Sequence, residues 1–330
     1  MSGKICLRLW LYNTIMRLKQ KSILLLLTII IFGVLFYSVD FVEAVKTVKQ
    51  ANLIFLICSF FIMCTFPLWC AIRWNIIVKR MGAKLGLWQS FVIIMAAWPV
   101  GAITPAKSGD LIKVLFLKNV MPYGKTTGVI IAERMMDLFA LSLYGLMGGI
   151  YLGNYGISII AGAILSGVIL FFILAASPMM NLIPDKFRQF ISEVLEASKQ
   201  LYLHLGTFIG LLLITLLNWF CSFLQTWFCF KAFHADVPLL YIAASLPIAI
   251  FIGLIPITPS GMGTRDSAMI YLFRNAAPYE TNLAVGILYS IFGYWLLAIM
   301  GIPFLRSALG GSIKNIHGDI MRKEIFKRSE

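Results

Sequence analysis

The chain has few charged residues, few histidines and no cysteine spacing that suggests a metal or redox site. Charged residues make up 13% of its 330 residues, whereas 60% are hydrophobic, and this balance excludes an ordinary soluble domain. Its three histidines, His204, His234 and His317, lie far apart, and none of its six cysteines forms a Cys-x-x-Cys pair. We therefore expect no metal and no cofactor.

Nucleotide-binding loops and catalytic motifs are also missing, so the sequence gives no catalytic residue and favours a protein that is not an enzyme. The formal net charge is +14, but no nucleic-acid motif accompanies it. Because the basic residues cluster at the ends of apolar runs, we interpret this charge as membrane topology and attraction to anionic lipids, with no nucleic-acid partner.

Long apolar runs fill most of the chain and predict an all-α polytopic membrane protein. About six of them are long enough to span a bilayer: 22–39, 51–72, 127–152, 157–176, 208–230 and 283–305. Two further pairs of runs are too short to cross comfortably: 91–103 with 111–120, and 241–257 with 267–273. Each short pair predicts a helical hairpin that enters and leaves the membrane on one side.

The two hairpins break at the same motif, Ile-Thr-Pro-x-x-x-Gly, at 103–109 and at 257–263. Proline ends the preceding helix and glycine allows a tight turn. The unit of span, broken hairpin and span thus occurs in both halves, about 51–153 and 205–309. The distribution of basic residues gives the two units opposite orientations, so we predict an inverted repeat, which is typical of transporters.

The same charge distribution predicts that both termini lie in the cytoplasm. We expect the protein to lie in the plasma membrane. We expect residues 1–313 to form a single membrane domain and 314–330 a basic cytoplasmic tail. Within the domain, residues 185–204 alternate apolar and charged side chains at helical spacing, which predicts an amphipathic helix in the membrane interface.

Charged side chains inside apolar segments are costly and therefore indicate function. Each hairpin break carries a cation and a carboxylate, Lys107 with Asp110 and Arg265 with Asp266. The helix that restarts after each break offers free N–H groups, so a phosphate or carboxylate headgroup fits there, with Arg265 as a bidentate clamp. The alternative is that these charges neutralise each other and hold the hairpins in place.

A second charged group, Glu133, Arg134 and Asp137, lies near the start of the third span. One of its carboxylates can remain available to Lys107, to a substrate or to a proton, or all of them can form a structural ion cluster. The candidate substrate-binding residues are Arg265, Asp266, Lys107, Asp110, Thr104, Thr258, Gly109, Gly263, Glu133, Arg134 and Asp137.

Three stretches give the chain a resemblance to the flippase-like membrane domain of lysylphosphatidylglycerol synthases: 104–113, 133–137 and 256–266. The resemblance covers nearly the whole chain and implies movement of a phospholipid or lipid-linked sugar between leaflets. Asp266 stands where the family usually has glutamate, and Ser260 where glycine is common. The chain ends where a synthase continues into its aminoacyltransferase domain, so we expect a stand-alone member that does not make the lipid itself.

Two other functions remain open at this point. One is a membrane-embedded transferase that acts on a lipid-linked sugar, and the other is an accessory subunit of envelope glycolipid synthesis. The expected partners are a membrane lipid, either an anionic phospholipid or a polyprenyl-phosphate-linked sugar, and a second copy of the chain or the enzymes of envelope synthesis.

Overall fold

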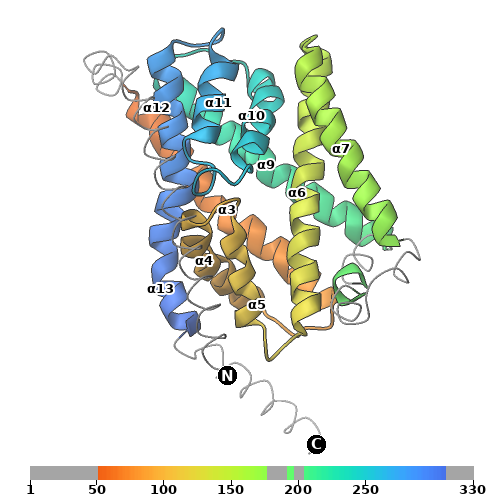
Figure 1. Cartoon of the computed structure of the whole chain (residues 1–330). Coiled ribbons are helices and arrows are strands. Elements are labelled where there is room, and N and C mark those ends of the chain that lie inside the picture. The colour runs from red at the N-terminus through yellow and green to blue at the C-terminus, as the bar shows by residue number, and fades with distance from the viewer. Residues whose placement is uncertain (1–50, 177–191, 197–203, 310–330) are drawn as a thin grey trace, which may run out of the picture.

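A computed structural model describes residues 51–176, 192–196 and 204–309, which are helical apart from turns and short connections (Figure 1). The helices are α3 (Leu53–Arg80), α4 (Leu87–Ile103), η1 (Ser108–Leu111), α5 (Ile112–Phe116), α6 (Tyr123–Tyr151), α7 (Tyr155–Ala176), α9 (Leu205–Ala232), α10 (Leu239–Gly253), α11 (Thr264–Phe273), α12 (Tyr279–Ser290), η3 (Ile291–Leu296) and α13 (Leu297–Leu309). These ranges contain no strand, so the all-α prediction is confirmed for them.

Four of the described helical stretches are long and apolar enough to cross a membrane: Leu53–Arg80, Tyr155–Ile173, Leu205–Ala232 and Tyr279–Ala308. They correspond to the second, fourth, fifth and sixth expected spans. Helix α6, the third, has 29 residues, but the charges in its interior lower its hydropathy. The expected span 22–39 and tail 314–330 lie outside the described residues, as does most of 185–204, of which 192–196 are helical.

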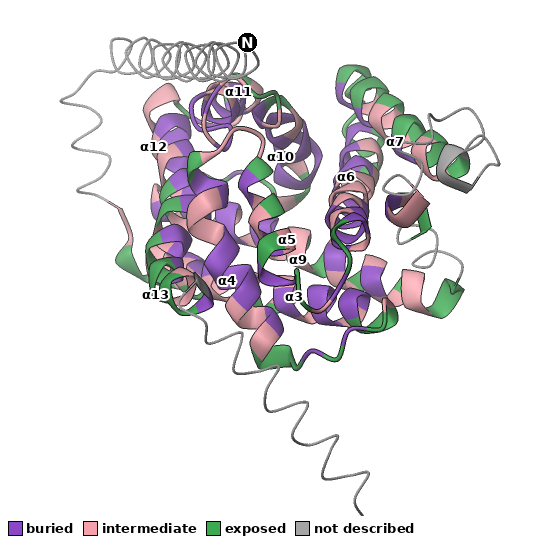
Figure 2. Cartoon of the chain, turned by 60° about the horizontal axis from the view of Figure 1, so that its bottom comes forward, coloured by how far each residue is buried: buried purple, intermediate pink, exposed green. Residues whose placement is uncertain are grey.

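Figure 2 shows many exposed residues on the outer faces of these helices. Many of the exposed residues carry large apolar side chains. Phe61 of α3, Ile159 of α7 and Leu213 of α9 are 64%, 70% and 60% exposed. So much exposed apolar surface suits a lipid environment better than water.

The two halves contain the same elements in the same order. Helices α3 and α9 each have 28 residues, and each is followed by a short apolar helix, α4 or α10, with an internal proline. A broken tip, a short helix and a long helical stretch then complete each half. In Figure 1 the α4–α5 hairpin lies in the lower part of the molecule and the α10–α11 hairpin in the upper part.

Each hairpin packs against the long helix of the other half, α4 against α13 and α10 against α6. Glycines make this close approach feasible, because there is no space for a side chain. A Cβ added at Gly148 of α6 would lie 2.5 Å from the Cβ of Ala244, and one at Gly301 of α13 would lie 2.4 Å from the carbonyl oxygen of Met95. The two halves are therefore packed closely against each other at these helix contacts.

Replacing Gly148 by alanine is expected to destabilise the protein by about 1–3 kcal/mol, because the added methyl group overfills this helix contact. Gly167→Ala in α7 is the matched control, since nothing lies within 4 Å of a Cβ at that position. Thermal unfolding in detergent compares the two variants. A Gly148→Ala protein as stable as the control would contradict the close contact between α6 and α10.

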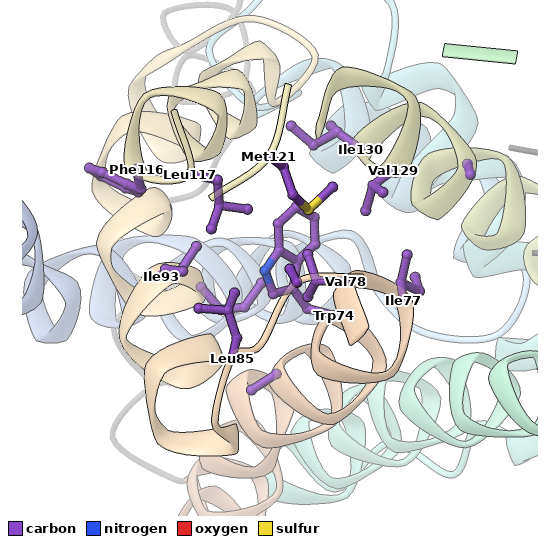
Figure 3. Close-up of a cluster of buried hydrophobic side chains, with 14 of the residues drawn as sticks. Trp74, Ile77, Val78, Leu85, Ile93, Phe116, Leu117, Met121, Val129 and Ile130 are labelled. Atoms are coloured by element: carbon purple, nitrogen blue, oxygen red, sulfur yellow. The ribbon is translucent and has the colours of Figure 1, made fainter. Parts of the chain in front are cut away.

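Two apolar cores anchor the bases of the hairpins. Trp74, Leu117 and Val129 are fully buried in a cluster that joins α3 to the α5 side of the first hairpin and to α6 (Figure 3). Phe223 and Phe273 belong to the corresponding cluster under the second hairpin. The cores fix the hairpins and leave their tips to polar contacts.

Candidate functional site

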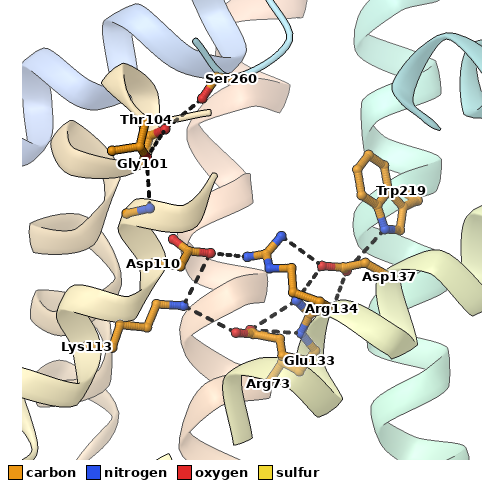
Figure 4. A network of polar contacts seen from close by, with 11 residues as sticks. Arg73, Gly101, Thr104, Asp110, Lys113, Glu133, Arg134, Asp137, Trp219 and Ser260 are labelled. Atoms are coloured by element: carbon orange, nitrogen blue, oxygen red, sulfur yellow. Dashed lines mark hydrogen bonds and ion pairs between the residues drawn. The ribbon is translucent and has the colours of Figure 1, made fainter. Parts of the chain in front are cut away.

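The tips of the two hairpins touch each other. Pro105 and Pro259 form an isolated antiparallel bridge, and the backbone N–H of Ser260 donates to the carbonyl oxygen of Thr104 at 3.1 Å. The Ser260 hydroxyl also donates to the carbonyl oxygen of Gly101 at 2.7 Å (Figure 4). The two copies of the Ile-Thr-Pro motif, remote in sequence, therefore meet at one point.

Both tips use the same unusual backbone. The two residues after each proline have positive φ angles, 50° and 55° at Ala106 and Lys107 and 48° and 73° at Ser260 and Gly261. A left-handed conformation costs an L-residue with a side chain about 1–2 kcal/mol, and glycine avoids that cost. Lys107 thus occupies a position where the other tip has glycine.

The backbone N–H groups expected to bind a headgroup are instead satisfied within the tips. The N–H of Gly109 donates to the Thr104 hydroxyl at 2.8 Å, and the N–H of Gly263 donates to the Asp266 carboxylate at 3.0 Å. The hydroxyl of the fully buried Thr258 lies 3.1 Å from that of Thr264. In this conformation these residues shape the turns, because the chain caps its own helix starts.

A dense ion network lies beside the first tip (Figure 4). The guanidinium of Arg73 donates to Glu133 at 3.0 Å and to Asp137 at 2.6 Å. Lys113 contacts the other oxygen of Glu133 at 3.2 Å, and Arg134 contacts Asp137 at 3.2 Å. The carboxylates of α6 are therefore both paired, and no free one remains for Lys107.

The expected pair of Lys107 with Asp110 is not formed. Asp110 pairs with Arg134 of α6 and lies 4.0 Å from the ammonium of Lys113. The ammonium of Lys107 instead lies over the ring of Tyr294, 4.5 Å from its centre. The break in the first hairpin places Lys107 on the side of η3, whereas Asp110 lies one turn later and meets α6.

Arg73 is the main residue that the sequence analysis missed. Arg73 follows directly after the expected span 51–72, but α3 continues to Arg80 and Arg73 is only 3% exposed. The sequence carries a signal for this burial, because the apolar run Ile76-Ile77-Val78 follows Arg73 after only two residues. A basic residue inside a continuing apolar pattern indicates a buried charge rather than a flank.

The second tip holds a smaller cluster around Arg265, which is 1% exposed. Its guanidinium pairs with Asp266 at 2.9 Å and contacts the hydroxyl of Ser290. It also lies over the rings of Tyr289 and Tyr294, 4.7 and 4.5 Å from their centres. This agrees with the predicted pair of Arg265 and Asp266. One nitrogen, Nη1, is buried without a hydrogen-bond partner among the described residues.

Two cavities with charged side chains in their linings flank the meeting point of the tips. One of about 90 Å³ is lined by the ion network and by Asn218, Ser222 and Tyr289. The other, of about 200 Å³, is lined by Lys107, Arg134, Asp137, Trp219 and Arg265, among others. Lys107, Arg134 and Asp137 line both cavities. Of the eleven predicted site residues, six charged ones are thus gathered here: Lys107, Asp110, Glu133, Arg134, Asp137 and Arg265.

Helix η3 lies against this region and adds a geometric irregularity. It is a π-helix of six residues that contains Tyr294, and the Trp98 indole donates to its Gly293 carbonyl at 3.3 Å. Such insertions are frequent at functional sites, because the wider turn displaces side chains and frees carbonyl groups. Here it positions the ring that both Lys107 and Arg265 contact.

Apolar helices, two broken hairpins that meet tip to tip, and buried charges around them define a multi-pass membrane protein with a central polar site. The chain belongs to the family of the lysylphosphatidylglycerol synthase transmembrane region, which matches residues 22–301.

Relatives include archaeal proteins named UPF0104 membrane proteins. One from Methanocaldococcus jannaschii is 21% identical and covers 86% of this chain and 94% of its own. One from Archaeoglobus fulgidus is 24% identical, with 83% and 90% covered, and one from Pyrococcus horikoshii is 22% identical, with 86% and 95% covered.

Proposed function

We propose that this protein is a lipid translocase that moves a phospholipid or a lipid-linked sugar between the two leaflets of the plasma membrane. The headgroup occupies the two cavities beside the hairpin tips, where charged side chains line them, and the acyl or polyprenyl chains stay in the surrounding lipid. Both hairpins re-enter the membrane from opposite faces, and both chain termini lie in the cytoplasm. The proposal includes no covalent step.

The contact between the two tips is the observation that carries this proposal. Two interrupted helical segments from opposite halves of a membrane protein, meeting beside buried charges, are the usual setting of a transported substrate. A contact of one backbone bridge, which includes the Ser260-to-Thr104 hydrogen bond, and one side-chain hydrogen bond is small enough to open and close. Alternate opening of the two sides of this contact would expose the cavities to one leaflet and then to the other.

Ion networks give the headgroup a polar environment in an otherwise apolar molecule. Arg134 is the most adaptable member, because it contacts both Asp110 and Asp137 and is 34% exposed. Its Nε atom is buried and has no hydrogen-bond partner among the described residues. An anionic headgroup can therefore bind Arg134 while the remaining pairs hold the helices together.

Cross-linking the tips tests the proposal directly. Antiparallel pairing of Pro105 with Pro259 brings Thr104 and Ser260 opposite each other, and opposed residues in such a pair are close enough for a disulfide. We expect the Thr104→Cys/Ser260→Cys protein, in a background without other cysteines, to stop moving lipid when oxidised and to resume after reduction. Each single cysteine variant is the control. Undiminished lipid movement by the oxidised, fully cross-linked protein would contradict the proposal.

A further inference from the structure

Cations and carboxylates are present in unequal numbers at the two cavities. The cations that line them are Arg73, Lys107, Lys113, Arg134 and Arg265. The carboxylates are Asp110, Glu133, Asp137 and, through its pair with Arg265, Asp266. Five cations against four carboxylates leave one positive charge in the described part of the site.

Lys107 accounts for this excess. Each of the other four cations has a carboxylate within ion-pair distance. No carboxylate of the described residues lies that close to Lys107, whose ammonium contacts the ring of Tyr294 instead. Lys107 can therefore accept an anionic partner without breaking an existing ion pair.

The larger cavity brings Lys107 together with two incompletely used guanidinium groups. Arg265 Nη1 and Arg134 Nε are both buried without a hydrogen-bond partner among the described residues. Both side chains line the cavity of about 200 Å³ with Lys107, and Asp137 is the carboxylate that faces them. Unsatisfied buried donors are costly, and an oxyanion supplies the acceptors that they need.

Backbone conformation points to the Lys107 side chain as well. Lys107 has a φ of 55°, and the matching position in the second tip is Gly261, with a φ of 73°. Glycine is the residue that suits this conformation. A lysine held there at a conformational cost indicates that its ammonium group serves the site.

We infer that the site takes a headgroup with a single net negative charge, a phosphodiester, and that Lys107 is its counter-ion. The inference rests on the proposed function and adds the charge of the substrate to it. One negative charge neutralises the site, which matters because uncompensated charge inside a membrane protein is costly. A phosphomonoester with two charges, a zwitterion or a lysyl-modified lipid would each leave the occupied site charged.

A phosphodiester can come from a glycerophospholipid or from a polyprenyl-phosphate sugar. Binding to the purified full chain in detergent distinguishes these sources and the charge. The probes are short-chain phosphatidylglycerol, phosphatidylcholine, phosphatidic acid, lysylphosphatidylglycerol, a short polyprenyl phosphoryl hexose, and water-soluble glycerophosphoglycerol. We expect phosphatidylglycerol or the polyprenyl phosphoryl hexose, the phosphodiester monoanions with a lipid chain, to bind most tightly. The expected difference is about tenfold over phosphatidylcholine, a zwitterion, phosphatidic acid, a dianion, and lysylphosphatidylglycerol, a cation. Equal affinities, or tightest binding of the zwitterion or the cation, would overturn the inference.

Lys107→Gly is the decisive variant, because glycine suits the backbone at this position and folding should be retained. We expect its melting temperature to be unchanged or higher, and its preference for the monoanion to disappear. Lys118→Gln removes an equal charge from an exposed position after the same hairpin and should keep the preference. A folded Lys107→Gly protein that still prefers the monoanion by about tenfold would refute the role of Lys107.

Binding and movement separate the two proposals. Lipid movement with no preference for a monoanion would sink the inference and leave the translocase standing. Selective binding of the monoanion without any movement in vesicles would sink the translocase and leave the binding site standing.

Discussion

Replacing Arg265 and Asp266 together by glutamine and asparagine is expected to slow lipid movement about 10- to 100-fold while the protein remains folded. The pair is buried, with 1% and 3% of the two side chains exposed, and it is neutral as a unit. Removing both charges leaves no uncompensated charge behind, so the fold survives. The proposed headgroup, however, loses the guanidinium that contacts the rings of Tyr289 and Tyr294. Vesicle assays of lipid movement measure the effect.

The single variant Arg265→Ala is expected to change the stability of the protein as well as the site. It leaves the carboxylate of Asp266 buried without its partner, which costs about 3–5 kcal/mol of stability. Loss of lipid movement in that variant alone would therefore not separate folding from function. The matched control for the double variant is Lys231→Gln/Asp236→Asn, which neutralises an ion pair whose aspartate is 89% exposed. If the double variant at Arg265 and Asp266 moved lipid as fast as this control, the proposed role of Arg265 would be wrong.

Replacing Arg73 by glutamine is expected to cause a large loss of stability, about 3–5 kcal/mol. Arg73 is the shared partner of Glu133 and Asp137 and also donates to the hydroxyl of Thr215 at 3.1 Å. Without its charge, two buried carboxylates of α6 compete for the remaining cations, Lys113 and Arg134. Chemical or thermal unfolding of the purified protein measures the loss.

The repeat supplies the control for Arg73. Arg73 lies 20 residues after the start of α3 at Leu53, and Gln225 lies 20 residues after the start of α9 at Leu205. Both amide atoms of Gln225 are buried without a hydrogen-bond partner among the described residues. Gln225→Leu should therefore be nearly neutral or stabilising. Equal losses in the two variants would show that burial of a polar group, rather than the ion network, determines stability here.

This comparison also shows how far the two halves have diverged. At the level of α3 and α9, one half has a charged residue with two acidic partners and the other has a neutral amide. Likewise, one tip carries Lys107 where the other carries Gly261. The helices and tips repeat, whereas the charges are concentrated beside the first hairpin. An asymmetric site of this kind suits a headgroup that is held mainly by one half and released by movement of the other.

The sequence predicted most of the helices and the two helix breaks well, because their signals are local, whereas re-entry of each hairpin on one side of the membrane stays a prediction. Apolar runs of bilayer length predicted α3, α7, α9 and the stretch from α12 to α13. The Ile-Thr-Pro motif predicted where both tips lie, and its prolines, Pro105 and Pro259, pair there. The pair of Arg265 and Asp266 was also predicted, since neighbouring residues of opposite charge in an apolar segment have few other partners.

Partners of the other charges could not be predicted, since they depend on how the helices pack. Asp110 selects Arg134 of α6 rather than Lys107, only three residues before it in the sequence, because the left-handed turn directs the two side chains apart. The contact between the tips themselves requires both hairpins to reach the same depth, which no local pattern specifies. The capping of Gly109 and Gly263 by Thr104 and Asp266 likewise depends on the folded turns.

Movement of fluorescent lipids in vesicles that contain the purified protein tests the central claim most directly. Lipids with monoanionic, dianionic, zwitterionic and cationic headgroups are labelled, and the fraction that reaches the outer leaflet is followed by its quenching with dithionite. We expect the wild-type protein to move lipids selectively by headgroup, and the double variant at Arg265 and Asp266 to move them about 10- to 100-fold more slowly. Well-folded wild-type protein that moves none of these lipids, including a polyprenyl-phosphate sugar, would contradict this claim.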